Sequence, residues 1–266
     1  MKFNISPRMD TDTQTLRQLQ RRFALAAAAL VPISPLLYLQ GQITRWKIGV
    51  LPDAAGPKFG IAGAPDGDDP ARLLVLGEST VAGLGARDHE HALAGRFAYY
   101  LSDAIGRPVR WNVIGRNGVT ARRTIDELVP LLPEERFDFV LLGLGGNDVL
   151  KLSSPRKWRR DMLELLSLLR TRNSSSEIFI TNCPMIVESP ALPEPIKSLL
   201  WQLSQMHDRN IREFSRDLAG VTYYPQPKEI DSENFFADGI HPSEEGYDRW
   251  ARAMIEYFAA DHELWK

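Results

Sequence analysis

The stretch "LLVLGESTVAGLGAR" at residues 73–87 sets an apolar run directly against a polar, glycine-rich turn. The run at 73–76 is long enough for a buried strand, and Gly77 ends it. Glu78, Ser79 and Thr80 follow at once. In a parallel sheet covered by helices, reactive groups gather at the carboxyl ends of the strands. The stretch therefore predicts a strand that presents Ser79 at its end.

Four further runs resemble buried strands, at residues 109–115, 137–146, 177–184 and 221–225. The segments between them have helical periodicity; Leu93, Phe97 and Leu101, for example, are four positions apart. Strands that alternate with helices predict a parallel sheet with helices on both faces. We therefore expect an α/β fold, a three-layer α/β/α sandwich around a five-stranded parallel sheet.

The bulk composition excludes several classes of protein. The 266 residues carry a net charge of −2 and a single cysteine. The charge gives no basic surface for nucleic acid, and one cysteine cannot form an intramolecular disulfide. We predict no metal site and no obligate protein partner.

The N-terminal part of the chain differs from the rest. Residues 1–47 combine a basic segment, "RQLQRR" at 17–22, with an uncharged and mostly apolar stretch at 23–44. This layout is typical of a signal sequence or a signal anchor, although Pro32 and Pro35 would kink such a helix. We expect membrane association through residues 23–44 and a membrane-anchored or exported protein rather than a cytoplasmic one. An amphipathic helix packed on the domain is the alternative.

Residues 48–70 are rich in glycine, proline, alanine and aspartate, a composition typical of linkers. The compact domain is accordingly expected over residues 71–262.

Three residues far apart in the chain have the chemistry of a nucleophilic hydrolase. A serine hydroxyl such as that of Ser79 is a weak nucleophile and needs a base. His241 can serve as that base, and Asp238, three residues earlier across "GI", can hold the imidazole in one tautomer. The sequence predicts Ser79, Asp238 and His241 as catalytic residues.

Such a reaction also needs hydrogen-bond donors for the developing oxyanion. Backbone N–H groups are suitable because they are fixed in place. The candidates are the N–H groups of Ser79 and Gly118 and the side-chain amide of Asn147.

Four blocks resemble the motifs of the SGNH hydrolases, the GDSL-type esterase and lipase superfamily. They are "GEST" with Ser79, "NVIGRNGVTARR" with Gly118, "GGND" with Asn147 and "DGIHPS" with His241. The resemblance covers about residues 71–260. It implies a flavodoxin-like fold, a serine mechanism through an acyl-enzyme, no cofactor, and carboxylic esters, thioesters or acetylated sugars as substrates. Glu78 stands where the family has aspartate, and Thr80 where it has leucine.

The loop "CPMIVESPALPEPI" at 183–196 is the largest candidate for substrate selection. Its apolar residues are expected to line an acyl pocket or simply to pack the loop: Met185, Ile186, Val187 and Leu192. Small esters and acylated glycans or lipids are the expected substrates. Two alternatives remain: a deacetylase of O-acetylated cell-surface glycans with the same residues, and a catalytically silent binding protein at the membrane.

Overall fold

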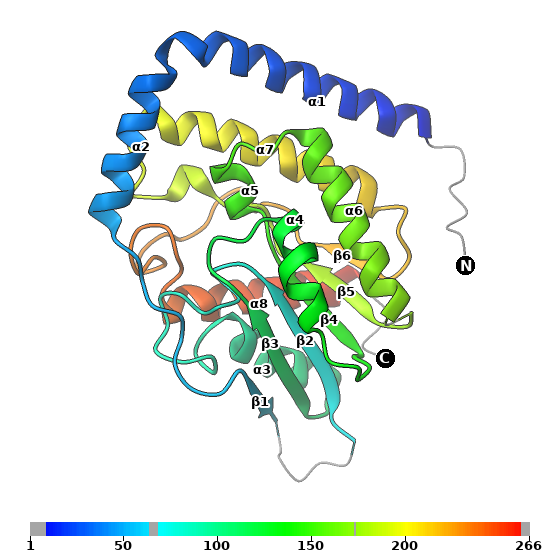
Figure 1. Cartoon of the computed structure of the whole chain (residues 1–266). Helices are drawn as coiled ribbons and strands as arrows, with labels where there is room; N and C mark the ends of the chain where they lie inside the picture. The colour runs from blue at the N-terminus through cyan, green and yellow to red at the C-terminus, as the bar shows by residue number, and fades with distance from the viewer. Residues whose placement is uncertain (1–8, 64–68, 173, 262–266) are drawn as a thin grey trace.

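A six-stranded sheet forms the centre of the computed structural model, which describes residues 9–63, 69–172 and 174–261 (Figure 1). The strand order is β1-β3-β2-β4-β5-β6, and β2 to β6 are mutually parallel. The order of these five strands is that of flavodoxin-like folds, so the predicted α/β architecture is confirmed. The strands are β1 (Phe59–Ala62), β2 (Ala71–Gly77), β3 (Val109–Gly115), β4 (Phe139–Gly143), β5 (Glu177–Ile180) and β6 (Val221–Tyr223).

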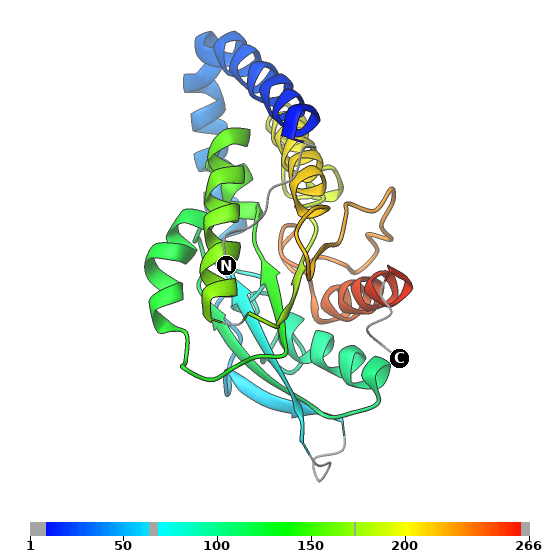
Figure 2. The same ribbon diagram turned by 90° about the vertical axis from the view of Figure 1, so that its right-hand side faces the viewer.

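Helices lie on both faces of this sheet (Figure 2). Helices α3 (Leu93–Ile105) and α8 (Glu244–Asp261) cover one face. Helices α6 (Pro155–Arg172) and α7 (Ile196–Ser215) cover the other, together with the segment that begins at α4 (Ala121–Arg123) and continues through a π-helical turn, η2 (Thr124–Leu128), and a 3₁₀ turn, η3 (Val129–Leu131). Two short helices, α5 (Gly146–Leu150) and η4 (Ile186–Glu188), follow the ends of β4 and β5.

The three layers follow from the alternation of side chains along the central strand β2. Successive residues of a strand point to opposite faces. Leu73 and Val75 accordingly pack with Phe258 of α8, whereas Leu74 packs with Trp158 of α6. All five side chains are fully buried. Burial on both faces explains why this strand is almost continuously apolar in sequence.

The sheet has one strand more than the five predicted, and its edge is mixed rather than parallel. Strand β1 comes from the stretch interpreted as a linker, residues 48–70, and pairs antiparallel with β3. Its sequence, "FGIA", does not have the pattern of a buried strand, because the large residues Phe59 and Ile61 are exposed and the partly buried positions are small residues. A Cβ at Gly60 would lie only 2.4 Å from the Trp111 ring, so the indole of β3 covers this edge.

Two N-terminal helices extend the fold beyond the sheet. Helix α1 (Met9–Leu30) packs along α6 and α7, with Leu19 buried against them. A 3₁₀ turn, η1 (Val31–Ile33), contains Pro32 and redirects the chain into α2 (Ser34–Ile48) (Figure 1). Residues 13–44 are long and apolar enough to cross a membrane. This is weak evidence for a membrane span, because signal sequences and core helices can meet the same criterion.

Candidate active site

Ser79 lies at the carboxyl end of β2 because the chain turns sharply at Gly77. A Cβ at Gly77 would stand 2.0 Å from the carbonyl oxygen of Gly143 on β4, so only glycine fits there. The next residue, Glu78, donates its N–H to the same Gly143 oxygen at 2.9 Å. The turn is closed by the Leu84 N–H, which donates to the Ser79 carbonyl at 3.1 Å. The nucleophile candidate is therefore fixed by the two central strands.

Asp238 and His241 lie on one tight turn just before α8. One carboxylate oxygen of Asp238, Oδ1, accepts hydrogen bonds from the backbone N–H groups of Ile240 at 2.9 Å and His241 at 2.7 Å. Gly239 adopts φ 85°, which favours glycine. The aspartate thus folds the loop that carries the histidine.

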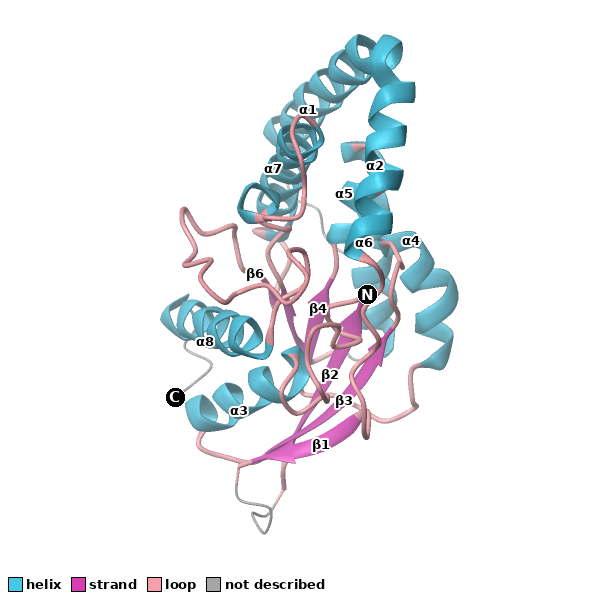
Figure 3. Ribbon diagram, turned by 90° about the vertical axis from the view of Figure 1, so that its left-hand side faces the viewer, coloured by secondary structure: helices cyan, strands magenta, loops and turns pink. Residues whose placement is uncertain are grey.

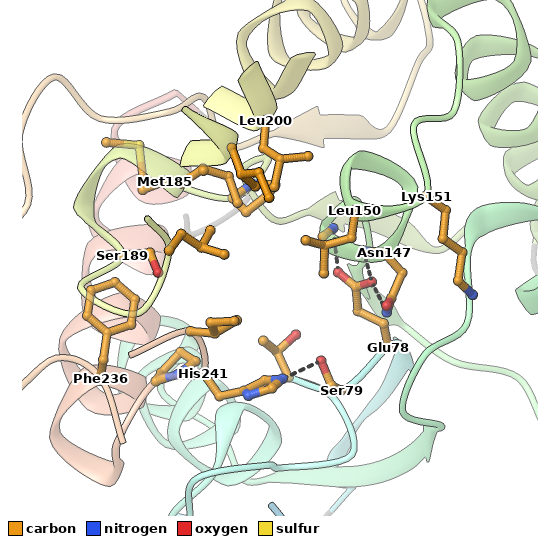
Figure 4. A pocket seen from close by; sticks show the side chains of 18 of the residues that line it. Glu78, Ser79, Asn147, Leu150, Lys151, Met185, Ser189, Leu200, Phe236 and His241 are labelled. Carbon is orange, nitrogen blue, oxygen red and sulfur yellow. Dashed lines mark hydrogen bonds between the residues drawn. The ribbon is translucent and has the colours of Figure 1, made fainter. Parts of the chain in front are cut away.

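The turn brings the imidazole of His241 between Asp238 and Ser79. Its Nδ1 lies 2.8 Å from Oδ2 of Asp238. Its Nε2 lies 3.1 Å from Oγ of Ser79, a contact drawn in Figure 4. Partial burial raises the pKa of Asp238, but hydrogen bonds from the His241 ring and backbone outweigh it and hold the pKa below its usual value. Asp238 is therefore ionised at neutral pH, and the three groups form one continuous chain of contacts.

Gly118 lies beside this chain in the loop between β3 and α4. Its φ is 78°, and its carbonyl accepts hydrogen bonds from Arg123 Nη1 at 3.2 Å and Lys151 Nζ at 2.5 Å. Within the described residues, the N–H groups of Ser79 and Gly118 have no acceptor. Two cations thus hold the Gly118 carbonyl in place, while the Gly118 N–H stays free to donate.

Asn147 lies in α5 and is held by Glu78. Oε2 of Glu78 accepts from both the backbone N–H and Nδ2 of Asn147, at 2.8 and 2.6 Å, and Oε1 accepts from the Gly146 N–H at 2.7 Å. Burial raises the pKa of Glu78 to about 7, even though these three donors oppose the shift. The buried Glu78 carboxylate therefore fixes the first residues of α5 in place.

A pocket of about 1400 Å³ opens in front of Ser79 and His241. Typical small-molecule sites measure roughly 300–1,000 Å³. Of the loop residues expected to line it, Met185, Ile186 and Leu192 do so, whereas Val187 does not and is 42% exposed. The pocket accordingly places an apolar wall beside the Ser79 hydroxyl.

Sequence reasoning missed two groups of pocket residues. Arg123 and Lys151 were not singled out, although Arg123 ends the block "NVIGRNGVTARR" and Lys151 lies three residues after "GGND", and their charges are the available signal. The second group belongs to the N-terminal helices, from Ala27 to Thr44, which were considered as a membrane segment or as a helix packed on the domain, but not as part of the site. Within the described residues, no group of three or more His, Cys, Asp or Glu side chains is placed to hold a metal ion.

The fold and these contacts define a class of protein. It is a doubly wound α/β protein in which a serine, a histidine and an aspartate are linked by successive contacts at the carboxyl edge of the sheet. The model of the GDSL-like Lipase/Acylhydrolase family matches residues 75–249. The chain belongs to this family of acylhydrolases. No curated protein matches it by sequence.

Several solved structures share the fold. The structure of TesA is 21% identical, with a TM-score of 0.53 over 70% of this chain and 96% of that one. The lipase Lip_vut3 from a goat rumen metagenome is 15% identical, with a TM-score of 0.56 over 73% and 99%. Est24, a carbohydrate acetylesterase from Sinorhizobium meliloti, is 18% identical, with a TM-score of 0.54 over 72% and 100%. At these identities the likeness concerns the fold alone.

Proposed function

We propose that the protein is a serine ester hydrolase that acts through an acyl-enzyme on carboxylic esters. The observation that carries the proposal is the aligned chain of Asp238, His241 and Ser79, with contacts of 2.8 and 3.1 Å. In this arrangement the ionised carboxylate orients Nδ1, so Nε2 is left to accept the serine proton.

In the first half-reaction, Oγ of Ser79 attacks the acyl carbon while its proton passes to Nε2 of His241. The ester carbonyl oxygen becomes an oxyanion, held by the N–H groups of Ser79 and Gly118 and by Asn147. An amide nitrogen carries two protons, so Nδ2 of Asn147 can donate to Glu78 and to the oxyanion at once. The ester C–O bond then breaks, and the imidazolium gives its proton to the departing alcohol.

In the second half-reaction, water replaces the alcohol. His241 takes a proton from the water, which attacks the acyl carbon of the acyl-enzyme. Collapse of the second oxyanion returns the proton to Oγ of Ser79 and releases the carboxylic acid. The cycle needs only groups that this chain supplies.

Hydrolysis of nitrophenyl butyrate by wild type and by Ser79→Ala tests the assignment. We expect the variant to lose at least a thousandfold in kcat and all covalent labelling by a fluorophosphonate. Ser198→Ala, an exposed serine on α7 away from the pocket, is the matched control and should keep both. Equal rates for Ser79→Ala and wild type would refute the nucleophile.

The substrate class is inferred from the pocket wall. Its apolar lining favours an acyl chain over a sugar, and we therefore prefer a lipid-like or simple ester to an acetylated glycan. Release of acetate from acetylated polysaccharide at a higher kcat/KM than hydrolysis of nitrophenyl butyrate would favour the deacetylase instead. A silent binding protein would neither hydrolyse the ester nor react with the fluorophosphonate.

Residues 23–44 are further proposed to attach the protein to a membrane, with the hydrolase domain at 71–262 completed by β1. Their length and apolar composition support this location. Recovery of the full-length chain entirely in the soluble fraction of lysed cells would contradict it.

A further inference from the structure

The N-terminal helices form one wall of the pocket that contains Ser79. Helix α2 lies beyond the carboxyl ends of the strands and contacts α7 (Figure 3). Apolar lining residues come from the end of α1, from η1, from α2 and from the chain that follows: Ala27, Leu30, Val31, Leu37, Gly41, Val50 and Leu51. The segment considered as a membrane anchor is therefore also part of the substrate site.

Helix α2 carries two stripes on opposite faces. Ser34, Leu37, Gly41 and Thr44 recur at helical spacing and line the pocket. The residues Leu36, Leu39, Ile43 and Trp46 recur at the same spacing on the opposite face, and all four are exposed. A stripe of small, polar and apolar residues therefore faces the pocket, and a fully apolar stripe is exposed on the opposite face.

Together with neighbouring residues of the N-terminal segment, some of which also line the pocket, this stripe forms the main exposed apolar surface of the described residues. Of sixteen large apolar side chains that are exposed, nine fall between Leu25 and Val50. A patch of this kind on a soluble protein marks an interaction surface. The mouth of the pocket continues it, because Leu150 and Leu152 line the pocket and are also exposed.

The charges around the patch indicate what covers it. Arg17, Arg21 and Arg22 precede the apolar stretch, Arg45 and Lys47 follow it, and no acidic residue occurs from 13 to 52. A second copy of this chain would bring a second cationic border against the first. An anionic lipid surface is complementary, since basic residues near it are attracted to its negative charge.

The bend at Pro32 determines how such a surface would be engaged. Helix α2 has 15 residues and is about 22 Å long at 1.5 Å per residue, short of the roughly 30 Å hydrocarbon core. Both helices are also tied to the domain: Arg156 N–H donates to Gln20 Oε1 at 3.2 Å, and Gln40 Nε2 donates to the Glu194 carbonyl at 2.8 Å. A straight spanning helix would withdraw the wall from the pocket.

We propose that residues 23–50 lie in one leaflet of an anionic bilayer, and that Ser79 hydrolyses an acyl ester of a lipid drawn from that leaflet along α2. This inference rests on the proposed ester hydrolase activity and adds its substrate class. The lipid acyl chain occupies the pocket between α2 and the loop before α7, while the headgroup stays near the basic border. Hydrolysis then releases a fatty acid and the deacylated lipid.

Flotation of the full-length protein with vesicles tests the docking. Wild type is expected to float with equal parts of phosphatidylcholine and phosphatidylglycerol, and at least tenfold less with phosphatidylcholine alone. Leu39→Glu should reduce flotation at least tenfold, because Leu39 is 55% exposed on the outer stripe. Leu131→Glu, at 57% exposed on η3, is the matched control and should float like wild type.

The pocket wall is tested by the ratio of nitrophenyl palmitate to nitrophenyl butyrate hydrolysis. A Cβ at Gly41 would lie 4.0 Å from Ile196 Cδ1, so a bulky side chain there enters the pocket. We expect Gly41→Phe to lower the ratio at least tenfold and Gly41→Ala to leave it within about twofold. An unchanged ratio in Gly41→Phe would contradict the proposal that α2 forms a wall of the acyl pocket.

Topology is tested by labelling single cysteines with an impermeant maleimide in sealed membrane vesicles, because the native Cys183 is buried. The variants Gln18→Cys and Lys47→Cys should react from the same side of the membrane. Labelling of only one of them would show a spanning helix and overturn the proposal. If Leu39→Glu floated like wild type, the proposal would also be overturned. If this variant lost self-association but still floated, the patch would bind a second copy of the chain rather than lipid. Ser79-dependent butyrate hydrolysis without vesicle binding refutes the lipid inference alone, whereas absence of that hydrolysis refutes the proposed function.

Discussion

Glu78 and Asn147 are joined twice: one carboxylate oxygen, Oε2, accepts from both the backbone N–H and the side-chain Nδ2 of Asn147, at 2.8 and 2.6 Å. The two residues are 69 positions apart, at the ends of neighbouring strands β2 and β4. The contact fixes the rotamer of the amide and directs its second proton away from Glu78. In the proposed mechanism Glu78 is therefore a positioning residue for an oxyanion donor.

Replacement of this carboxylate should weaken catalysis more than binding. In Glu78→Gln, one acceptor oxygen becomes a donor that opposes the Asn147 donors, so the oxyanion amide loses its fixed orientation. We expect kcat for nitrophenyl butyrate to fall at least tenfold, about 1.4 kcal/mol in the barrier, with KM changed less than about threefold. Glu78→Asp, which keeps the charge, should recover part of kcat. Equal losses in both variants would indicate a purely steric role.

The same carboxylate makes stability depend on pH. Its pKa is raised to about 7 in the folded protein, from 4.5 in the unfolded chain, because it is buried. Between these values the folded state holds a proton that the unfolded state has released, so the free energy of unfolding falls as pH rises. The contribution, about 3 kcal/mol, is complete below pH 4.5 and lost as pH rises through about 7.

Urea unfolding at about pH 5 and about pH 8 measures this contribution in wild type and Glu78→Gln. The stability difference between the two proteins should change with pH by about 2.5 kcal/mol, in favour of wild type at the lower pH. A constant difference would show that Glu78 has no shifted pKa.

Local sequence patterns were sufficient for much of this molecule. Strand β3 has the predicted bounds, and Asp238 and His241, three positions apart, meet within one turn. The pairing of Glu78 with Asn147 was not predictable, because no local pattern reports which buried donors face a carboxylate. Strand β1 was missed for a different reason: Gly60 lies against Trp111 of β3, and no local pattern reports a contact between two strands. The N-terminal wall of the pocket likewise depends on contacts with distant helices.

Asp238→Asn tests the orientation of the imidazole. The ionised carboxylate accepts the Nδ1 proton, whereas an amide nitrogen in its place would favour the other tautomer and remove the free acceptor at Nε2. We expect kcat to fall by about 10³–10⁴, as in other Ser–His–Asp triads, and fluorophosphonate labelling of Ser79 to slow in proportion. Asp103→Asn, an exposed aspartate on α3, should leave both unchanged. Wild-type labelling of Asp238→Asn would remove Asp238 from the mechanism.

Lys151→Met tests the cation that holds the Gly118 peptide. The ammonium donates to the Gly118 carbonyl at 2.5 Å but is exposed to solvent, and Arg123 donates to the same oxygen. Loss of one of two partners should therefore lower kcat only about two- to fivefold. The double variant Lys151→Met/Arg123→Met should lose more than the product of the single effects, measured as a double-mutant cycle on kcat. Strictly additive effects on kcat would show that the two cations do not act together on the Gly118 carbonyl.

Gly118→Ala separates backbone strain from loss of function. Its φ is 78°, and a Cβ there would meet no atom within 4 Å, so the substitution acts through the backbone alone. Gly106, at the end of α3, has φ 66° and the same free space, which makes Gly106→Ala a matched control far from the site. Both variants should lose about 1–2 kcal/mol of unfolding free energy, the cost of a left-handed non-glycine residue. Only Gly118→Ala should lose kcat, at least tenfold and at most the roughly 10²–10³ of a missing oxyanion donor. If the two variants kept equal activity, the Gly118 N–H would not be a donor to the transition state, and the oxyanion would depend on Ser79 and Asn147.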